Sequence, residues 1–268
     1  MRVWKAKLSR RIAALDRVLQ DPIVARANAD FLQKGEKGCR RAFDKLHRRL
    51  SRYAVLEGVR TTHNPIAVWA MLKPREAVVI EPDHPSDAQD CVVVDYMLTR
   101  QSEWGTTIAM GLWTLEVPDH ALGRGFMRAP GQDMEAAMLE AHHTTLRIRV
   151  ARMKPHFADP SARFFLPAGP GVFVCSAHIR SDVSMDGGLQ AYIRAHTWLH
   201  RDQLSDNREA EIFMVDDIAG ERLGEGYLLP MPLRVIEAMN VGRLTDTARV
   251  AVWVPGMPDT IAQPIGTA

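Results

Sequence analysis

The stretch CVVVDYMLTRQSEWGTTIAMGLWTL, residues 91–115, decides the fold class of this chain of 268 residues. Its two apolar runs, Cys91–Thr99 and Thr106–Leu115, are rich in β-branched and aromatic residues. These residue types favour strands, because their side chains pack well on a pleated surface. The polar link between the runs, residues 100–105, is short, so the stretch predicts an antiparallel β-hairpin.

On both sides of this hairpin the sequence predicts further strands and helices, but not in strict alternation. The other strand candidates are Ala77–Ile80, Arg163–Leu166, Val172–Ile179, Leu189–Leu199 and Arg249–Val254; residues 66–72 are an apolar run too short to classify. Helices are predicted over residues 3–20, 23–33, 39–57, 133–143, 202–213 and 233–239. The order predicts an α+β fold, with N-terminal basic helices followed by a mainly antiparallel sheet with helices packed on it.

Charge and composition divide the chain into three expected regions: a basic helical hairpin at 1–58, an α+β domain at 59–254 and a loose tail at 255–268. Residues 1–60 hold 16 Lys and Arg against 6 Asp and Glu, whereas the rest hold 18 against 26. A basic end favours nucleic acid or an acidic protein surface. The alternatives are a solvated helical face, or a face packed against the acidic remainder.

The overall composition is that of a soluble globular protein, with 46% apolar and 25% charged residues. Cys39, Cys91 and Cys175 lack the spacing of zinc ligands, which argues against structural zinc and for a reducing compartment. No apolar run approaches the roughly 18 residues of a membrane helix, and the basic N-terminus lacks a secretory signal. We therefore expect a cytoplasmic protein that does not enter a membrane. P-loop, nucleophile-elbow and zinc-protease motifs are absent from the sequence, so we expect no cofactor and no metal.

The first candidate site is VPDHALGRGFMR, residues 117–128, which predicts a short helix capped by the carboxylate of Asp119. Positions i, i+4 and i+8 share one helical face, so His120, Arg124 and Arg128 line up there. An imidazole and two guanidiniums in a row can move a proton and hold a phosphate. They are equally consistent with a solvated helix surface.

The second candidate site is QAYIRAHTWLH, residues 190–200, which reads as a strand. Strict alternation predicts one apolar face toward the core and a second face that carries an aromatic ring, a cation and two imidazoles. The residues of that second face are Tyr192, Arg194, His196, Trp198 and His200. Such a face can stack a base, bind a phosphate and exchange a proton. The alternative is an ordinary exposed sheet face.

Together the two segments suggest cleavage of RNA by its own 2′-hydroxyl, without a metal. His120 and His196 are the candidate acid–base pair, because imidazoles titrate near neutral pH, and Arg124 and Arg194 are the candidate phosphate ligands. His142 and His143 are reserve candidates. The expected nucleic-acid contacts are Arg128, Tyr192, Trp198, Arg40, Arg41, Arg48 and Arg49.

The pattern His120-Ala121-x-x-Arg124-x-x-x-Arg128 after a strand resembles the helix signature of some barnase–EndoU–colicin–RelE-like nucleases, which include phage and toxin members. The resemblance covers about residues 107–200. It implies N-terminal helices beside an antiparallel sheet whose open face holds catalytic residues. The sequence departs from the signature at Gly123 and Gly125, each of which weakens a helix by about 1 kcal/mol relative to Ala; Pro118 and Pro130 confine the helix to about three turns.

Two other functions stay open at the level of sequence. One is a non-catalytic protein that binds RNA or DNA through its basic N-terminal helices, with an affinity that falls steeply with salt. The other is a structural or interaction protein of a mobile element, whose basic helices meet an acidic protein partner or inhibitor. Convergence of His120, Arg124 and the 192–200 segment on one site would favour the nuclease.

Overall fold

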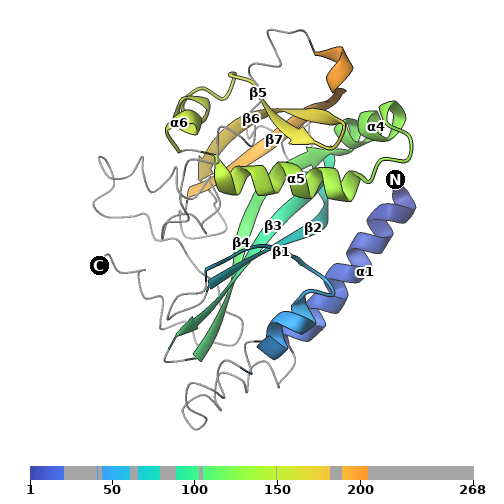
Figure 1. Cartoon of the computed structure of the whole chain (residues 1–268). Coiled ribbons are helices and arrows are strands. Elements are labelled where there is room, and N and C mark those ends of the chain that lie inside the picture. Colours follow the sequence, from blue (N-terminus) through green and yellow to red (C-terminus); the bar gives the residue numbers. More distant parts are fainter. Residues whose placement is uncertain are drawn as a thin grey trace.

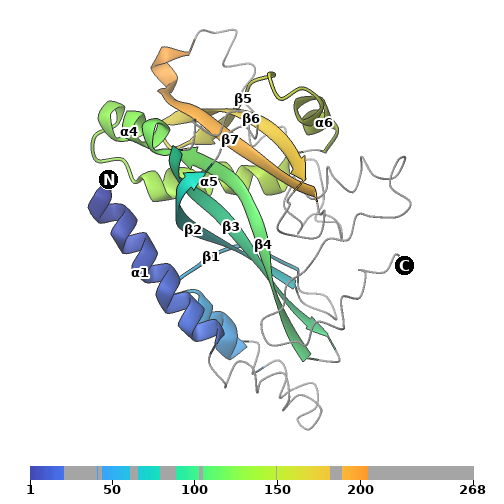
Figure 2. The same ribbon diagram turned by 180° about the vertical axis from the view of Figure 1, so that it is seen from behind.

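The computed structural model describes residues 1–20, 41, 44–60, 66–78, 89–102, 105–148, 150–181 and 189–204. Along the chain, its elements are α1 (Arg2–Leu19), β1 (Val55–Arg60), β2 (Ile66–Val78), β3 (Gln89–Ser102), β4 (Gly105–Pro118), α4 (Asp119–Arg128), α5 (Met134–Arg147), α6 (Val150–Ala158), β5 (Phe164–Ala168), β6 (Gly171–Ser181), β7 (Leu189–His200) and the 3₁₀ turn η2 (Arg201–Gln203). Figure 1 shows α5 lying across one face of the sheet. Figure 2, from behind, shows β4 and β7 in front of it.

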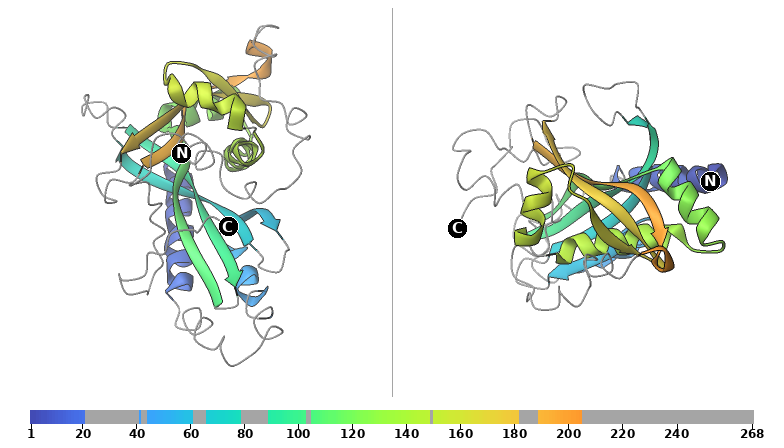
Figure 3. Two further views of the ribbon diagram at one scale, coloured as in Figure 1. Left: turned by 90° about the vertical axis from the view of Figure 1, so that its left-hand side faces the viewer. Right: turned by 90° about the horizontal axis from the view of Figure 1, so that it is seen from above.

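The described strands form one sheet in the order β1-β2-β3-β4-β7-β6-β5. Every neighbouring pair is antiparallel except β4–β7, which is parallel and pairs Leu115 with Ile193. The predicted α+β class with a mainly antiparallel sheet is therefore confirmed. The sheet twists strongly, so that β6 and β7 lie at the opposite end of the molecule from the end of β3 and the beginning of β4 (Figure 3).

The predicted hairpin of residues 91–115 is β3–β4. Its ladder runs from the pair Cys91–Pro118 to the pair Ser102–Gly105, so the strands extend into the polar link that was expected between them. The inward-facing residues Val92, Val94, Leu115 and Val117 are fully buried. A fully buried side chain of this size stabilises a fold by about 1.5–3 kcal/mol.

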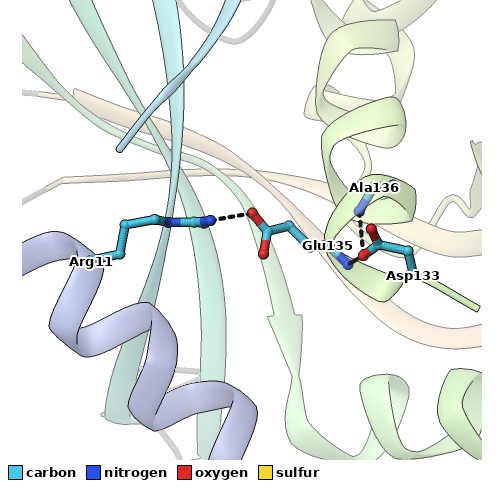
Figure 4. A network of polar contacts seen from close by, with 4 residues as sticks. All are labelled: Arg11, Asp133, Glu135 and Ala136. Atoms are coloured by element: carbon cyan, nitrogen blue, oxygen red, sulfur yellow. Dashed lines mark hydrogen bonds and ion pairs between the residues drawn. The ribbon is translucent and has the colours of Figure 1, made fainter. Parts of the chain in front are cut away.

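The core beneath this sheet face is closed by α4, α5 and α6. Residues spaced as a helical stripe on α5, namely Met134, Ala137, Met138 and Ala141, join the same buried cluster as the strands. The helix begins where expected because the Asp133 carboxylate accepts the N–H groups of Glu135 and Ala136 (Figure 4). It continues to Arg147, four residues beyond the predicted end.

The first predicted helix, α1, is confirmed, and it packs on the sheet through Leu8, Ile12 and Leu15. Val3, in the first turn of the same helix, is 78% exposed. The cations of α1 meet acids of the later chain. Lys5 Nζ lies 2.5 Å from Asp119 Oδ1, and Arg11 binds Glu135 of α5 (Figure 4). Part of the basic end is thus packed against the acidic remainder.

The helix predicted over residues 39–57 is shorter than expected. Helical hydrogen bonding gives way to turns after Leu50, whose carbonyl accepts the N–H groups of Tyr53 and Ala54. Val55 then starts β1 and pairs with Ala70 of β2. The apolar spacing alone continued the helix, but cross-strand pairing determines the structure of residues 55–60, so β1 begins inside the predicted 1–58 region.

Several expected elements lie outside the described residues: the helices at 23–33 and 233–239, the strand at 249–254 and the tail at 255–268. Of the helix predicted at 202–213, only residues up to 204 are described, and there the chain forms η2. Residues 77–78 of the Ala77–Ile80 candidate end β2.

One buried carboxyl group gives the fold a testable pH dependence. Asp95 of β3 is 4% exposed, and burial raises its pKa to about 6, against the opposing effect of Lys73, whose Nζ lies 3.8 Å away. A raised folded-state pKa stabilises the fold below the unfolded value of 3.8, and that stabilisation is lost as pH rises through about 6. The stability of Asp95→Asn relative to the parent should therefore rise by about 2.5 kcal/mol between pH 4 and pH 8.

Denaturant unfolding of both proteins at each pH measures this difference. The same substitution at exposed Asp16 is the matched control. The difference in stability between Asp16→Asn and the parent should be the same at each pH. Comparing Asp95→Asn with the parent cancels the titration of other groups. If the difference in stability between Asp95→Asn and the parent does not change with pH, ionising Asp95 does not destabilise the folded protein.

Candidate site at the junction of α4 and β7

A bulge in β7 shapes the candidate site. Cys175 of β6 pairs with Ala195, but the preceding residue of β6, Val174, pairs with Thr197. His196 therefore stands between two register pairs and belongs to neither. One extra residue reverses the alternation of side chains beyond it. Ala195 and Trp198 consequently share the core face, and the expected single face of residues 192–200 is wrong.

The two aromatic residues expected to stack on bases are buried instead. Trp198 is fully buried in the main core, and its indole Nε1 donates to the carbonyl of Ala168 at 3.1 Å. Tyr192, on the other side of the bulge, is 3% exposed and stacks on the ring of His178 with centroids 5.2 Å apart. Neither ring is available to a nucleic-acid base, so both assignments are corrected.

Arg194 is also inside the protein. Its guanidinium lies 3.3 Å from Glu116 Oε1, and the two side chains are only 4% and 1% exposed. The parallel register of β4 and β7 explains the pair, because Glu116 stands directly beside Arg194. A cation enclosed with its own carboxylate is not placed to hold a substrate phosphate, which corrects the expected role of Arg194.

The predicted row on α4 is present at the surface. His120, Arg124 and Arg128 are exposed, whereas Ala121, Leu122 and Gly125 on the other side of the helix are buried. Gly125 has a specific use. A Cβ there would lie 2.6 Å from Met134 Cε and 3.6 Å from Trp198 Cγ, so glycine lets α4 approach the core.

The start of α4 differs from the expectation in one detail. Asp119 is the first helical residue rather than the cap; Pro118 occupies the cap position, and no side chain caps the helix there. The Asp119 carboxylate binds Lys5 of α1 instead. It still lies in the first turn, where a negative charge is favoured by the helix dipole.

Each member of the α4 row contacts the bulged end of β7 or the turn after it. His120 Nε2 lies 2.7 Å from the carbonyl oxygen of His196. Arg124 Nη1 donates to Thr197 Oγ1 at 2.9 Å. Arg128 Nη1 donates to the Trp198 carbonyl at 3.1 Å and to Gln203 Oε1 at 3.0 Å. The structure thus brings together the helix and strand that the sequence singled out.

The partners of these cations differ from those of the cations that form ion pairs in the described part of the chain. Lys5, Arg11, Lys73 and Arg194 each contact a carboxylate. Arg124 and Arg128 are held by a hydroxyl, a main-chain carbonyl and an amide oxygen, which are neutral. Neutral acceptors orient a guanidinium without cancelling its charge. The α4 row therefore presents positive charge to solvent.

His196 has an unusual environment. Burial lowers its pKa to about 4, with further lowering by the cations of Arg163 and Arg194 and by the rings of His178 and His120. Its ring is consequently neutral at pH 7. A neutral imidazole cannot supply the proton of a general acid, so His196 is not supported as the acid of the expected acid–base pair near neutrality.

Sequence reasoning missed two residues next to His196. Ser176 Oγ lies 2.6 Å from the Nε2 of His178 and 2.6 Å from the Nε2 of His196. Ser176 and His178 alternate on β6 within a strand that was predicted, so they share a face. Pairing this strand with residues 190–200 would have placed them opposite Arg194 and Tyr192.

The remaining candidates lie elsewhere. His142 is fully buried and His143 half-buried on α5. Arg41 and Arg48 are exposed and Arg49 is half-buried, and the helical segment at 44–50 lies at the far end of the molecule from α4 in Figures 1 and 2. Arg40 is outside the described residues. The structure thus does not join these arginines to the α4 row.

Over the ranges that the structure covers, no helix is long and apolar enough to cross a membrane. Over the same ranges, no group of three or more His, Cys, Asp or Glu is arranged to hold a metal ion. Comparison with protein-family models, with curated proteins and with solved structures finds no match for this chain.

Proposed function

We propose that the junction of α4 and β7 cleaves RNA without a metal, with His120 as the general base and with Arg124 and Arg128 as phosphate ligands. One observation carries this proposal: an imidazole and two guanidiniums stand in an exposed row, each oriented on β7 or η2 by neutral acceptors. Fixed donors and uncompensated charge are what a phosphate ester requires.

The hydrogen bond of His120 to the His196 carbonyl indicates which of its two ring nitrogens acts as the base. A carbonyl oxygen only accepts, so the Nε2–H of His120 donates to His196, and in the neutral ring the lone pair is at Nδ1. In the proposed reaction, Nδ1 takes the proton of the 2′-hydroxyl. The O2′–P bond forms as the P–O5′ bond breaks, and the leaving 5′-oxygen takes a proton from water; the hydroxide that remains takes the proton from His120 and restores the base. The products are a 2′,3′-cyclic phosphate and a 5′-hydroxyl.

The two arginines support this step by binding negative charge. Each guanidinium has five N–H donors, and the contacts of Arg124 and Arg128 with β7 and η2 involve Nη1. Guanidiniums already oriented by such contacts need little reordering when a phosphate binds. They would stabilise the charge that builds on the phosphate oxygens in the transition state.

The test is cleavage of a labelled single-stranded RNA by the purified protein in the presence of EDTA. We expect cleavage that stops when the nucleotide at the scissile position is 2′-deoxy. His120→Ala should lower the rate at least about 100-fold, the usual contribution of a general base. Arg124→Gln should raise KM and lower kcat. Arg48→Gln, which removes an equally exposed arginine at the far end, is the matched control.

Cleavage that persists in His120→Ala, or that needs a divalent ion, would overturn the proposal. RNA binding without cleavage, falling with salt and weakened in Arg124→Gln, would instead support the non-catalytic binding alternative on this same row. Binding that is insensitive to Arg124→Gln but lost on neutralising Arg41 and Arg48 would point to the N-terminal helices. If the protein neither binds nor cleaves RNA, the remaining alternative is the structural or interaction protein.

A further inference from the structure

The Ser176 hydroxyl joins two imidazoles behind the proposed base. Its oxygen is 2.6 Å from Nε2 of both His178 and His196, and the serine is fully buried. The His178 ring is itself held by stacking on Tyr192, at an angle of 16° between the rings. These contacts connect the interior of the β6–β7 ladder to the bulged residue.

The chemistry of a hydroxyl makes this arrangement specific. Ser176 has one O–H proton, so it can donate to only one of the two imidazoles and accepts the Nε2–H of at least one. Both rings are held at Nε2 by the same oxygen. Such a contact fixes the orientation of a ring, as an outer partner does for a metal-bound histidine.

His196 transmits this orientation to the surface. Its backbone lies between two register pairs of the β6–β7 ladder, and its side chain is held by Ser176. Its carbonyl oxygen, turned out of the ladder by the bulge, accepts the Nε2–H of His120. The line of contacts thus runs from His178 through Ser176 and His196 to His120.

We propose that Ser176 and His178 are positioning residues for His120: by holding the His196 ring, they hold the bulged carbonyl that fixes the tautomer of His120. This inference rests on the proposed role of His120 as the base. It adds a requirement for Ser176 and His178, two residues that lie outside the row on α4. The serine touches no substrate and acts only through the bulge.

The test uses two variants of the full chain, Ser176→Ala and His178→Phe; the second keeps a ring against Tyr192 but removes the nitrogen. The first readout is the ¹⁵N NMR spectrum of the histidine rings, which reports the tautomer of His120 whether or not RNA is cleaved. We expect the population with Nε2–H to fall in both variants. The second readout is kinetic. We expect kcat to fall by about 10- to 100-fold, as when an outer-shell partner is removed, with KM for RNA nearly unchanged.

Ser9→Ala, at an exposed serine of α1, is the matched control and should change neither readout. An unchanged His120 tautomer in a folded Ser176→Ala or His178→Phe protein overturns the inference, even if kcat falls. A parent protein that cleaves no RNA defeats the proposed function but leaves the NMR comparison to decide the positioning. If Ser176→Ala does not fold, His178→Phe carries the same test.

Discussion

Arg194→Met should destabilise the fold by about 3–5 kcal/mol, the usual cost of leaving one member of a buried ion pair alone. Glu116, its partner, is 1% exposed, so its carboxylate would lose its counter-ion where water cannot replace it. Cys91 beside it supplies no counter-charge, because a thiol is neutral when protonated and negative when ionised; burial, followed by the charge of Glu116, raises its pKa to about 12, so it stays neutral. Urea unfolding at pH 7 measures the loss.

A second variant separates the ion pair from the volume of the side chain. In Arg194→Met combined with Glu116→Gln, the buried charge is gone, and most of the lost stability should return, because well-packed neutral replacements of buried pairs are often nearly neutral. Arg124→Met is the surface control and should change stability by less than about 0.5 kcal/mol. A small loss in Arg194→Met alone would mean that Arg194 is solvated, and would restore it as a phosphate ligand.

The contrast between Arg194 and Arg124 shows where reading the sequence succeeds. A helical row is a local property, set by 3.6 residues per turn, so the face shared by His120, Arg124 and Arg128 followed from residues 117–128 alone. The hairpin of residues 91–115 followed equally from composition and a short link. Both predictions needed no knowledge of any distant segment.

The orientation of the β7 side chains depended on a distant segment. Alternation holds only while each residue has a partner, and the bulge at His196 arises from the register of β7 against β6, not from residues 190–200 themselves. Arg194 was likewise assigned to the surface because its partner Glu116 is 78 residues away. Nothing in the local pattern distinguishes an arginine that binds phosphate from one enclosed with a carboxylate.

In the candidate site, the predicted row on the helix is therefore present, whereas the predicted face of the strand is not. His120, Arg124 and Arg128 form the exposed row that the helical spacing predicted, and each contacts β7. The strand supplies mainly backbone carbonyls and the Thr197 hydroxyl rather than stacking rings. The bulge is what makes this possible, since it turns the His196 carbonyl toward α4 and sends Trp198 into the core. Under the proposed function, we expect a site of this form to select phosphate and ribose chemistry rather than base identity.

Trp198→Ala should cost about 3–5 kcal/mol of folding free energy, the range for removing a large buried ring. Trp198 is fully buried, its indole donates to the Ala168 carbonyl, and its ring lies against Gly125 of α4. Trp198→Phe keeps most of the volume but loses the hydrogen bond, so we expect a smaller loss of about 1–2 kcal/mol. Thermal and urea unfolding of both variants measure these differences.

Met127→Ala, at a residue 73% exposed on the same helix, is the matched control and should stay within about 0.5 kcal/mol of the parent. The opposite outcome has a definite form: Trp198→Ala would keep the stability of the parent but bind RNA more weakly, as expected of a ring that stacks on a base. That result would place the ring outside the core and restore the uninterrupted alternation of β7. Loss of stability would instead identify Trp198 as the core residue against which α4 packs, and α4 carries the row of His120, Arg124 and Arg128.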